Sequence, residues 1–113
     1  MIKIEAVLEP DGTLRACKAA GHAGAGKKGS DIVCASVSAL IRAAVSTLSG
    51  KKGITLRYGA PERGEIWLEA DYEAEGKDFL FAVGQFLING LSSVAQEYPG
   101  NCNLNIGFVQ EPG

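Results

Sequence analysis

The 113-residue sequence has no unbroken apolar run close to the ~20 residues that a membrane-spanning helix needs. It also lacks a strong charge of either sign, because 11 Lys and Arg stand against 13 Asp and Glu, for a net charge of -2. A strongly basic domain is the usual mark of a nucleic-acid binder. Residues 1–12 alternate apolar with charged side chains, unlike the apolar segment of a secretory signal. The sequence therefore predicts a cytoplasmic protein that binds neither membrane nor nucleic acid directly.

Cysteine and histidine are scarce, with three cysteines at scattered positions and a single histidine. An odd number of scattered cysteines suits free thiols better than a disulfide framework. Cys17, His22, Cys34 and Cys102 offer the donor set of a zinc site, but no pair has the close spacing of structural zinc sites. We therefore expect no metal site, and we expect Cys17 and Cys102 to pack in the core.

The hydropathy pattern predicts one domain over residues 1–113, with the ordinary globular composition of 46% hydrophobic and 21% charged residues. Alternating apolar residues predict five strands, and apolar residues at helical spacing predict two helices. The expected order is β-β-α-β-β-α-β, which indicates an α+β fold with two helices packed on a mostly antiparallel five-stranded sheet. The expected bounds are near 2–8, 13–20, 30–49, 54–58, 65–72, 77–97 and 101–109.

The two predicted helices differ in which residues lie opposite their main apolar stripe. In the first, Ser36, Ala39, Ala43 and Ser46 make that side small rather than charged, which permits close approach by another helix or a second subunit. In the second, apolar residues cover a wide arc, which predicts burial on two sides.

The most informative segment lies between the second strand and the first helix. His22 lies just past the end of the strand, and Cys34 lies in the first turn of the helix, where Ser30 or Asp31 is a plausible N-cap. A helix N-terminus and a neighbouring imidazolium both lower the pKa of a cysteine thiol, as a nucleophile requires. Spacing alone does not show that His22 and Cys34 meet. The pattern by itself favours a packed structural thiol for Cys34, at the edge of the apolar stripe.

The same segment partly matches a phosphate-binding loop. Gly21 and Gly26-Lys27 have the required spacing, but Lys28 occupies the position that needs Ser or Thr to hold magnesium. The preceding strands also form a predicted hairpin instead of part of a βαβ unit. We therefore do not expect a nucleotide cofactor, although the N–H groups at the helix start are able to bind an anion.

The residues Gly21-His22-Ala23, the glycine-rich loop that follows, and Asp31–Ala35 with Val37–Leu40 resemble the ribosomal-processing cysteine protease family, Prp. The resemblance extends over the whole chain. It implies a cytoplasmic cysteine endopeptidase without a cofactor, which removes the N-terminal extension of a large-subunit bacterial ribosomal protein, protein twenty-seven. It also implies a homodimer.

The resemblance assigns Cys34 as the nucleophile and His22 as the general base, and it gives supporting roles to Gly21, Asp31 and Ser38. For Asp31 we favour capping of the helix over orienting His22. Ser38 is one turn beyond Cys34, so its hydroxyl reaches either the site or the helix backbone. A flexible loop over the site is implied for the segment that contains Gly24, Gly26 and Gly29.

A second interpretation, which involves no catalysis, stays open. In it the chain is a ribosome-assembly factor that binds RNA or anions through the glycine-rich loop. Under that interpretation Lys27 and Lys28 govern binding and its salt dependence, and Cys34 is dispensable.

Overall fold

The computed structural model describes residues 1–21 and 30–110. Its elements follow the predicted order, with one short 3-10 turn (η1) added before the second helix. They are β1 (Ile2–Leu8), β2 (Leu14–Ala20), α1 (Ser30–Leu48), β3 (Ile54–Gly59), β4 (Glu65–Tyr72), η1 (Ala74–Gly76), α2 (Lys77–Glu97) and β5 (Cys102–Phe108).

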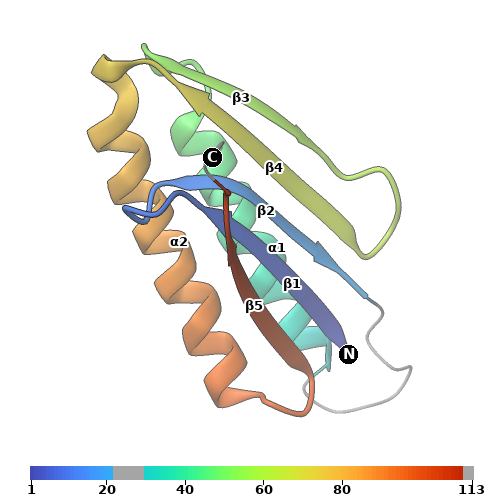
Figure 1. Cartoon of the computed structure of the whole chain (residues 1–113). Coiled ribbons are helices and arrows are strands. Elements are labelled where there is room, and N and C mark those ends of the chain that lie inside the picture. Colours follow the sequence, from blue (N-terminus) through green and yellow to red (C-terminus); the bar gives the residue numbers. More distant parts are fainter. Residues whose placement is uncertain (22–29, 111–113) are drawn as a thin grey trace.

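The five strands form one sheet in the order β3-β4-β2-β1-β5. Three of the four neighbouring pairs are antiparallel, and β1 and β5 are parallel, with Ile2 opposite Cys102 and Leu8 opposite Phe108. Both helices cover the same face of the sheet and run antiparallel to each other (Figure 1). The α+β fold with a mostly antiparallel sheet is therefore confirmed.

The core lies between this sheet face and the helices. The alternate residues Ile2, Ile4, Ala6 and Leu8 of β1 are all buried, as their period of two predicts. The helical stripe of α1 packs against them with its residues Val33, Val37, Ile41, Ala44 and Leu48, each at most 5% exposed. α1 ends at Leu48, and Gly50 follows with a φ of 74°, which is the usual left-handed end of a helix.

The predicted burial of α2 on two sides is wrong for a single copy of the chain. Leu80, Leu87 and Leu91 are buried against the sheet, but Phe86 is 73% exposed and Phe79 is 39% exposed. The apolar arc of α2 is as wide as predicted, yet no described element covers its outer part. α2 therefore has one buried side and one apolar side that is exposed.

The turn between β1 and β2 is tied to α2 by polar contacts. The Lys77 ammonium lies 2.8 Å from an Asp11 carboxylate oxygen. The other Asp11 oxygen accepts hydrogen bonds from the backbone N–H and the hydroxyl of Thr13. These contacts lower the pKa of Asp11 to about 2, with the Lys77 bond as the largest cause and the Thr13 bonds next. The charged form of Asp11 is thus the one that the folded turn favours.

Candidate active site

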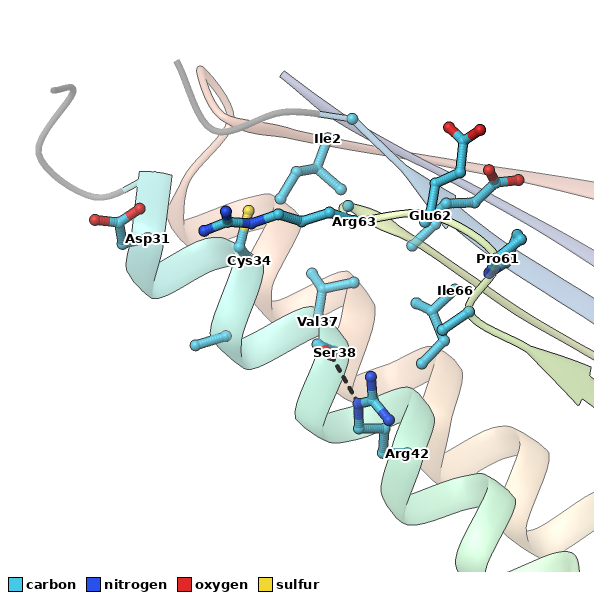
Figure 2. A pocket seen from close by; sticks show the side chains of 16 residues that line it. Ile2, Asp31, Cys34, Val37, Ser38, Arg42, Pro61, Glu62, Arg63 and Ile66 are labelled. Carbon is cyan, nitrogen blue, oxygen red and sulfur yellow. Dashed lines mark hydrogen bonds between the residues drawn. The ribbon is translucent and has the colours of Figure 1, made fainter. Parts of the chain in front are cut away.

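A cavity of about 910 Å³ opens between the N-terminal half of α1 and the turn that joins β3 to β4. Ile2, Val37 and Ile66 give it an apolar lining, and Cys34 and Asp31 lie toward one end with Arg42 toward the other (Figure 2). Its volume is in the range of sites that enclose most of a small ligand or a short peptide segment. Of the three cysteines, only Cys34 lines this cavity.

Cys34 lies in the second turn of α1, one turn later than predicted, because the helix already begins at Ser30. It is half-buried, with one side against the main core cluster and the other at the cavity. The prediction that it sits at the edge of the apolar stripe is confirmed. The first turn of a helix leaves N–H groups without an acceptor inside the helix. Cys34 directly follows this turn, so these N–H groups lie close to it along the helix.

Asp31 is exposed, lines the cavity and lies within the first turn of α1, after its first residue Ser30. As an N-cap Asp31 would have to precede the first helical residue, but the helix starts at Ser30, two residues earlier than that role requires. A carboxylate in the first turn still interacts favourably with the positive end of the helix dipole. Asp31 therefore stabilises the start of the helix that carries Cys34.

Ser38 lines the same cavity one turn beyond Cys34. Its hydroxyl oxygen accepts a hydrogen bond of 3.2 Å from Nε of Arg42, which also lines the cavity (Figure 2). Two roles were expected for the Ser38 hydroxyl, a contact in the site or a hydrogen bond to the helix backbone. The structure shows the first, because Ser38 lines the cavity and holds Arg42. Sequence reasoning missed Arg42, since one arginine on an exposed helix turn carries no distinguishing signal.

Gly21 ends the described segment after β2 and also lines the cavity. Its φ is 143°, and a Cβ placed on it would lie 2.3 Å from the backbone oxygen of Met1 and 3.0 Å from Cα of Ile2. Its N–H donates to the carbonyl of Gly64 at 3.1 Å. Only glycine fits this position, which explains structurally why a glycine stands there.

Four site residues predicted from the sequence cannot be placed. His22 and the loop glycines Gly24, Gly26 and Gly29 lie outside the described residues. The chain reaches His22 immediately after Gly21, whose backbone lines the cavity beside Cys34.

The wall opposite α1 is the β3–β4 turn, which the sequence predicts only as the connection between two strands. Pairing of β2 with β4 places Ala20 opposite Glu65 and so carries the turn to the end of β2. Glu62, Arg63 and Glu65 bring charges of both signs to this wall. The position of this turn beside the cavity follows from the long-range pairing of β2 with β4. No local pattern in the sequence predicts it.

The remaining cysteines belong to the core, as predicted. Cys17 is 1% exposed and Cys102 is 2% exposed. Burial raises the pKa of the Cys17 thiol to about 12, and burial also raises the pKa of Cys102, with a smaller contribution from nearby Cys34. Neither thiol is available as a thiolate near neutral pH. Within residues 1–21 and 30–110, no three His, Cys, Asp or Glu side chains are grouped so as to hold a metal ion.

The hairpin of β1 and β2 also bears on the phosphate-loop alternative. These strands pair antiparallel, as predicted, but β2 and β3 are both antiparallel to β4, which lies between them. α1 therefore joins two parallel strands, as the helix of a split βαβ unit does. The hairpin is thus no argument against a phosphate-binding loop, and the argument against one is the sequence, which has Lys28 where Ser or Thr would hold magnesium. The loop residues of that motif, Gly26 to Lys28, lie outside the described residues.

A family model described as cysteine protease Prp matches residues 1–103. The chain belongs to this family. A search of curated proteins found no match. A cysteine protease uses a cysteine thiol as its nucleophile. The presence of Cys34 at the cavity is therefore consistent with membership of this family.

Solved structures show the same fold. An essential ribosomal processing protease Prp from S. aureus, in complex with a substrate peptide, is 23% identical and has a TM-score of 0.78, over 94% of this chain and 99% of that one. The same protease with a covalently linked product peptide is 24% identical, with a TM-score of 0.77 over the same shares. The protein SMU.848 from Streptococcus mutans is 24% identical, with a TM-score of 0.78 over 96% of each chain. The β-β-α-β-β-α-β arrangement is thus the Prp fold.

Proposed function

We propose that this protein is a cysteine endopeptidase that removes the N-terminal extension of a large-subunit bacterial ribosomal protein, protein twenty-seven. The observation that carries the proposal is the position of Cys34, the one thiol at a large cavity in a chain of the cysteine protease Prp family. The similar S. aureus protein is a ribosomal processing protease seen with substrate and product peptides, and this supports the substrate class. The compartment that fits this substrate is the cytoplasm, and the active form is a homodimer.

The reaction uses Cys34 as nucleophile and His22 as general base. His22 takes the thiol proton, and the thiolate sulfur attacks the scissile carbonyl carbon. The imidazolium then gives its proton to the leaving amine as the carbon–nitrogen bond breaks, which leaves a thioester on Cys34. A water molecule, deprotonated by His22, attacks the thioester, releases the new carboxylate and restores the thiol.

The oxyanion that develops at the scissile carbonyl needs hydrogen-bond donors already in place. The first turn of α1 offers N–H groups with no acceptor inside the helix, one turn before Cys34. Gly21 supports the site by holding the end of β2 against Met1 and Gly64, next to His22 in the chain. Asp31 supports it by stabilising the start of α1.

The cavity has the shape and lining for an extended peptide. Cys34 and Arg42 are eight residues apart on α1, about 12 Å, which matches about three to four residues of an extended chain. The floor of Ile2, Val37 and Ile66 accepts apolar side chains, and Arg42, held by Ser38, is placed to donate to a peptide carbonyl or a carboxylate. The peptide therefore lies along α1 with its scissile bond at Cys34.

The test is the intact mass of the extended ribosomal protein after incubation with the wild type, Cys34→Ala, His22→Ala and Cys17→Ala. We expect one N-terminal loss with the wild type and with Cys17→Ala, because Cys17 is buried away from the cavity, and no loss with the other two variants. Cleavage by Cys34→Ala, or an intact substrate with the wild type, would overturn the proposal. Binding of ribosomal RNA that survives in Cys34→Ala but not in a Lys27→Ala, Lys28→Ala variant would favour the assembly-factor interpretation instead.

A further inference from the structure

The four arginines of the chain differ in what they contact. Arg15 and Arg57 form ion pairs with carboxylates outside the cavity. Arg42 and Arg63 line the cavity, and neither forms an ion pair with a carboxylate in the part of the chain that the structure describes. A guanidinium group is always charged and carries five N–H donors. The cavity therefore presents two cationic groups with donors left for a ligand.

The carboxylates around the cavity do not neutralise these two arginines. Figure 2 shows the side chains of Asp31 and Glu62 pointing away from the space between α1 and the β3–β4 turn. The Glu65 carboxylate lies 3.1 Å from the Lys18 ammonium, so its charge is already paired. The charge that faces the inside of the cavity is therefore positive.

The two arginines reach the cavity from opposite walls. Arg63 extends from the β3–β4 turn across the cavity toward the end where Cys34 lies (Figure 2). Arg42 follows Cys34 by eight residues on α1, about 12 Å along the helix axis, and it is held by its hydrogen bond of 3.2 Å to Ser38. An extended peptide rises about 3.3 Å per residue. A peptide with its scissile bond at Cys34 thus has Arg63 beside the residue next to that bond, and Arg42 beside about the third or fourth residue.

We propose that Arg42 and Arg63 determine which substrate side chains this protein accepts, favouring Asp and Glu and rejecting Lys and Arg. Arg63 acts at the residue next to the scissile bond, and Arg42 acts at about the third or fourth residue from it. A carboxylate at either position accepts N–H bonds from the guanidinium group in the planar geometry that suits Arg. A basic side chain there meets a like charge, while the nearby carboxylates point away from it. The inference rests on the proposed peptidase and names the chemical class of its substrate.

The phosphate groups of RNA are the other anions that two arginines suggest. RNA carries a charge at every nucleotide, so a protein that binds it needs cations spread over a wide surface. Here Asp31, Glu62 and Glu65 surround the same cavity, and the whole chain has a net charge of -2. These acids repel a polyanion but leave room between the two arginines for single carboxylate side chains. The charge distribution therefore favours a peptide with acidic side chains over RNA.

The first experiment measures kcat/KM for a peptide of the ribosomal protein extension in which single positions are varied. Glu, Gln and Lys are placed in turn at each position up to about four residues on either side of the scissile bond. We expect Glu over Gln and Gln over Lys, roughly three- to tenfold at each step, as for an ion pair between exposed and buried. The preference should appear next to the bond and again at about the third or fourth residue on one side. It should shrink in about 1 M NaCl, because salt screens the charges.

The second experiment assigns the two positions by charge reversal. Arg63→Glu should reverse the preference only next to the bond, and Arg42→Glu only at the more distant position. Lys52→Glu is the matched control, because it makes the same change in net charge at an exposed side chain outside the cavity. Each preference compares two peptides with the same variant, so a general loss of activity cancels. Both arginines are exposed, so we expect the variants to keep the wild-type circular dichroism spectrum.

Equal rates for the Glu, Gln and Lys peptides would overturn the proposal, although their cleavage would still support the peptidase. Preferences that Lys52→Glu alters as much as the arginine variants do would also overturn it, because the effect would then come from overall charge. Ribosomal RNA that the wild type binds and Arg42→Glu releases, together with equal peptide rates, would overturn it in favour of RNA. A wild type that cleaves none of the peptides, the unaltered one included, would overturn the peptidase and this inference with it.

Discussion

Gly21→Ala tests how the site is held together. At this position φ is 143°, and an added Cβ would lie 2.3 Å from the oxygen of Met1 and 3.0 Å from Cα of Ile2, which is buried in the first strand of the core. A side chain held in such a backbone conformation costs about 1–3 kcal/mol. Displacing the backbone of residues 1 and 2 adds to this, so we expect a loss of about 3 kcal/mol in unfolding free energy. For a chain of this length that is about 10 °C in melting temperature.

Two other glycines provide matched controls for this substitution. Gly50 also has a positive φ, 74°, but a Cβ there meets nothing within 4 Å, so Gly50→Ala should lose only about 1 kcal/mol. Gly100 has open space and no positive φ, so Gly100→Ala should melt like the wild type.

The assay is urea unfolding of the four proteins, followed by circular dichroism, with peptide cleavage measured on the same samples. We expect the order Gly100→Ala, Gly50→Ala, Gly21→Ala in increasing loss of stability, and reduced cleavage only in Gly21→Ala. A Gly21→Ala protein as stable as Gly100→Ala would refute the steric argument. Reduced cleavage in that stable protein would show that Gly21 acts through substrate contact.

Three further predictions concern the turn, the groove and the thiols. Because the pKa of Asp11 falls from 3.8 to about 2 on folding, its charge stabilises the fold fully above about pH 4, and this contribution is lost as the pH falls through and below about 2. The unfolding free energies of the wild type and Asp11→Asn should therefore converge as the pH is lowered from about 4 to about 1, and an undiminished difference at about pH 1 would contradict the assignment. Ser38→Ala frees Arg42 and should raise KM for the peptide roughly two- to tenfold with kcat unchanged, whereas a fall in kcat alone would place Ser38 in the chemistry. A thiol reagent should modify one cysteine in the folded protein and three in urea, since Cys17 and Cys102 are buried; rapid reaction of two or more in the folded protein would contradict this packing.

Much of the fold is predictable because its signals are local. The alternation in residues 2–8 and the stripe from Val33 to Leu48 each report one buried face, and the structure buries those residues. The parallel pairing of β1 with β5 has no such signal, because it joins the two ends of the chain.

The site divides in the same way. Cys34 and Gly21 stand out in the sequence because a thiol near a helix start and a glycine at a strand end are recognisable locally. The opposite wall, residues 60–66, comes to the site only through the pairing of β2 with β4.

The outer side of α2 was predicted to be buried because its composition is that of a buried surface. The composition of a helix side does not show whether residues of the same chain or of another molecule bury it.

The central claim is that Cys34 is the nucleophile of a peptidase that cuts the ribosomal protein extension. A peptide of the extension that ends in a chloromethyl ketone at the cleavage position tests this most directly, because the reagent alkylates the cysteine that attacks it. Digestion and mass mapping should find one adduct, on Cys34. Adding the unmodified substrate peptide should slow the formation of this adduct, because the two compete for the same site. An adduct on Cys17 or Cys102, or active enzyme in which Cys34 stays unmodified, would contradict the account.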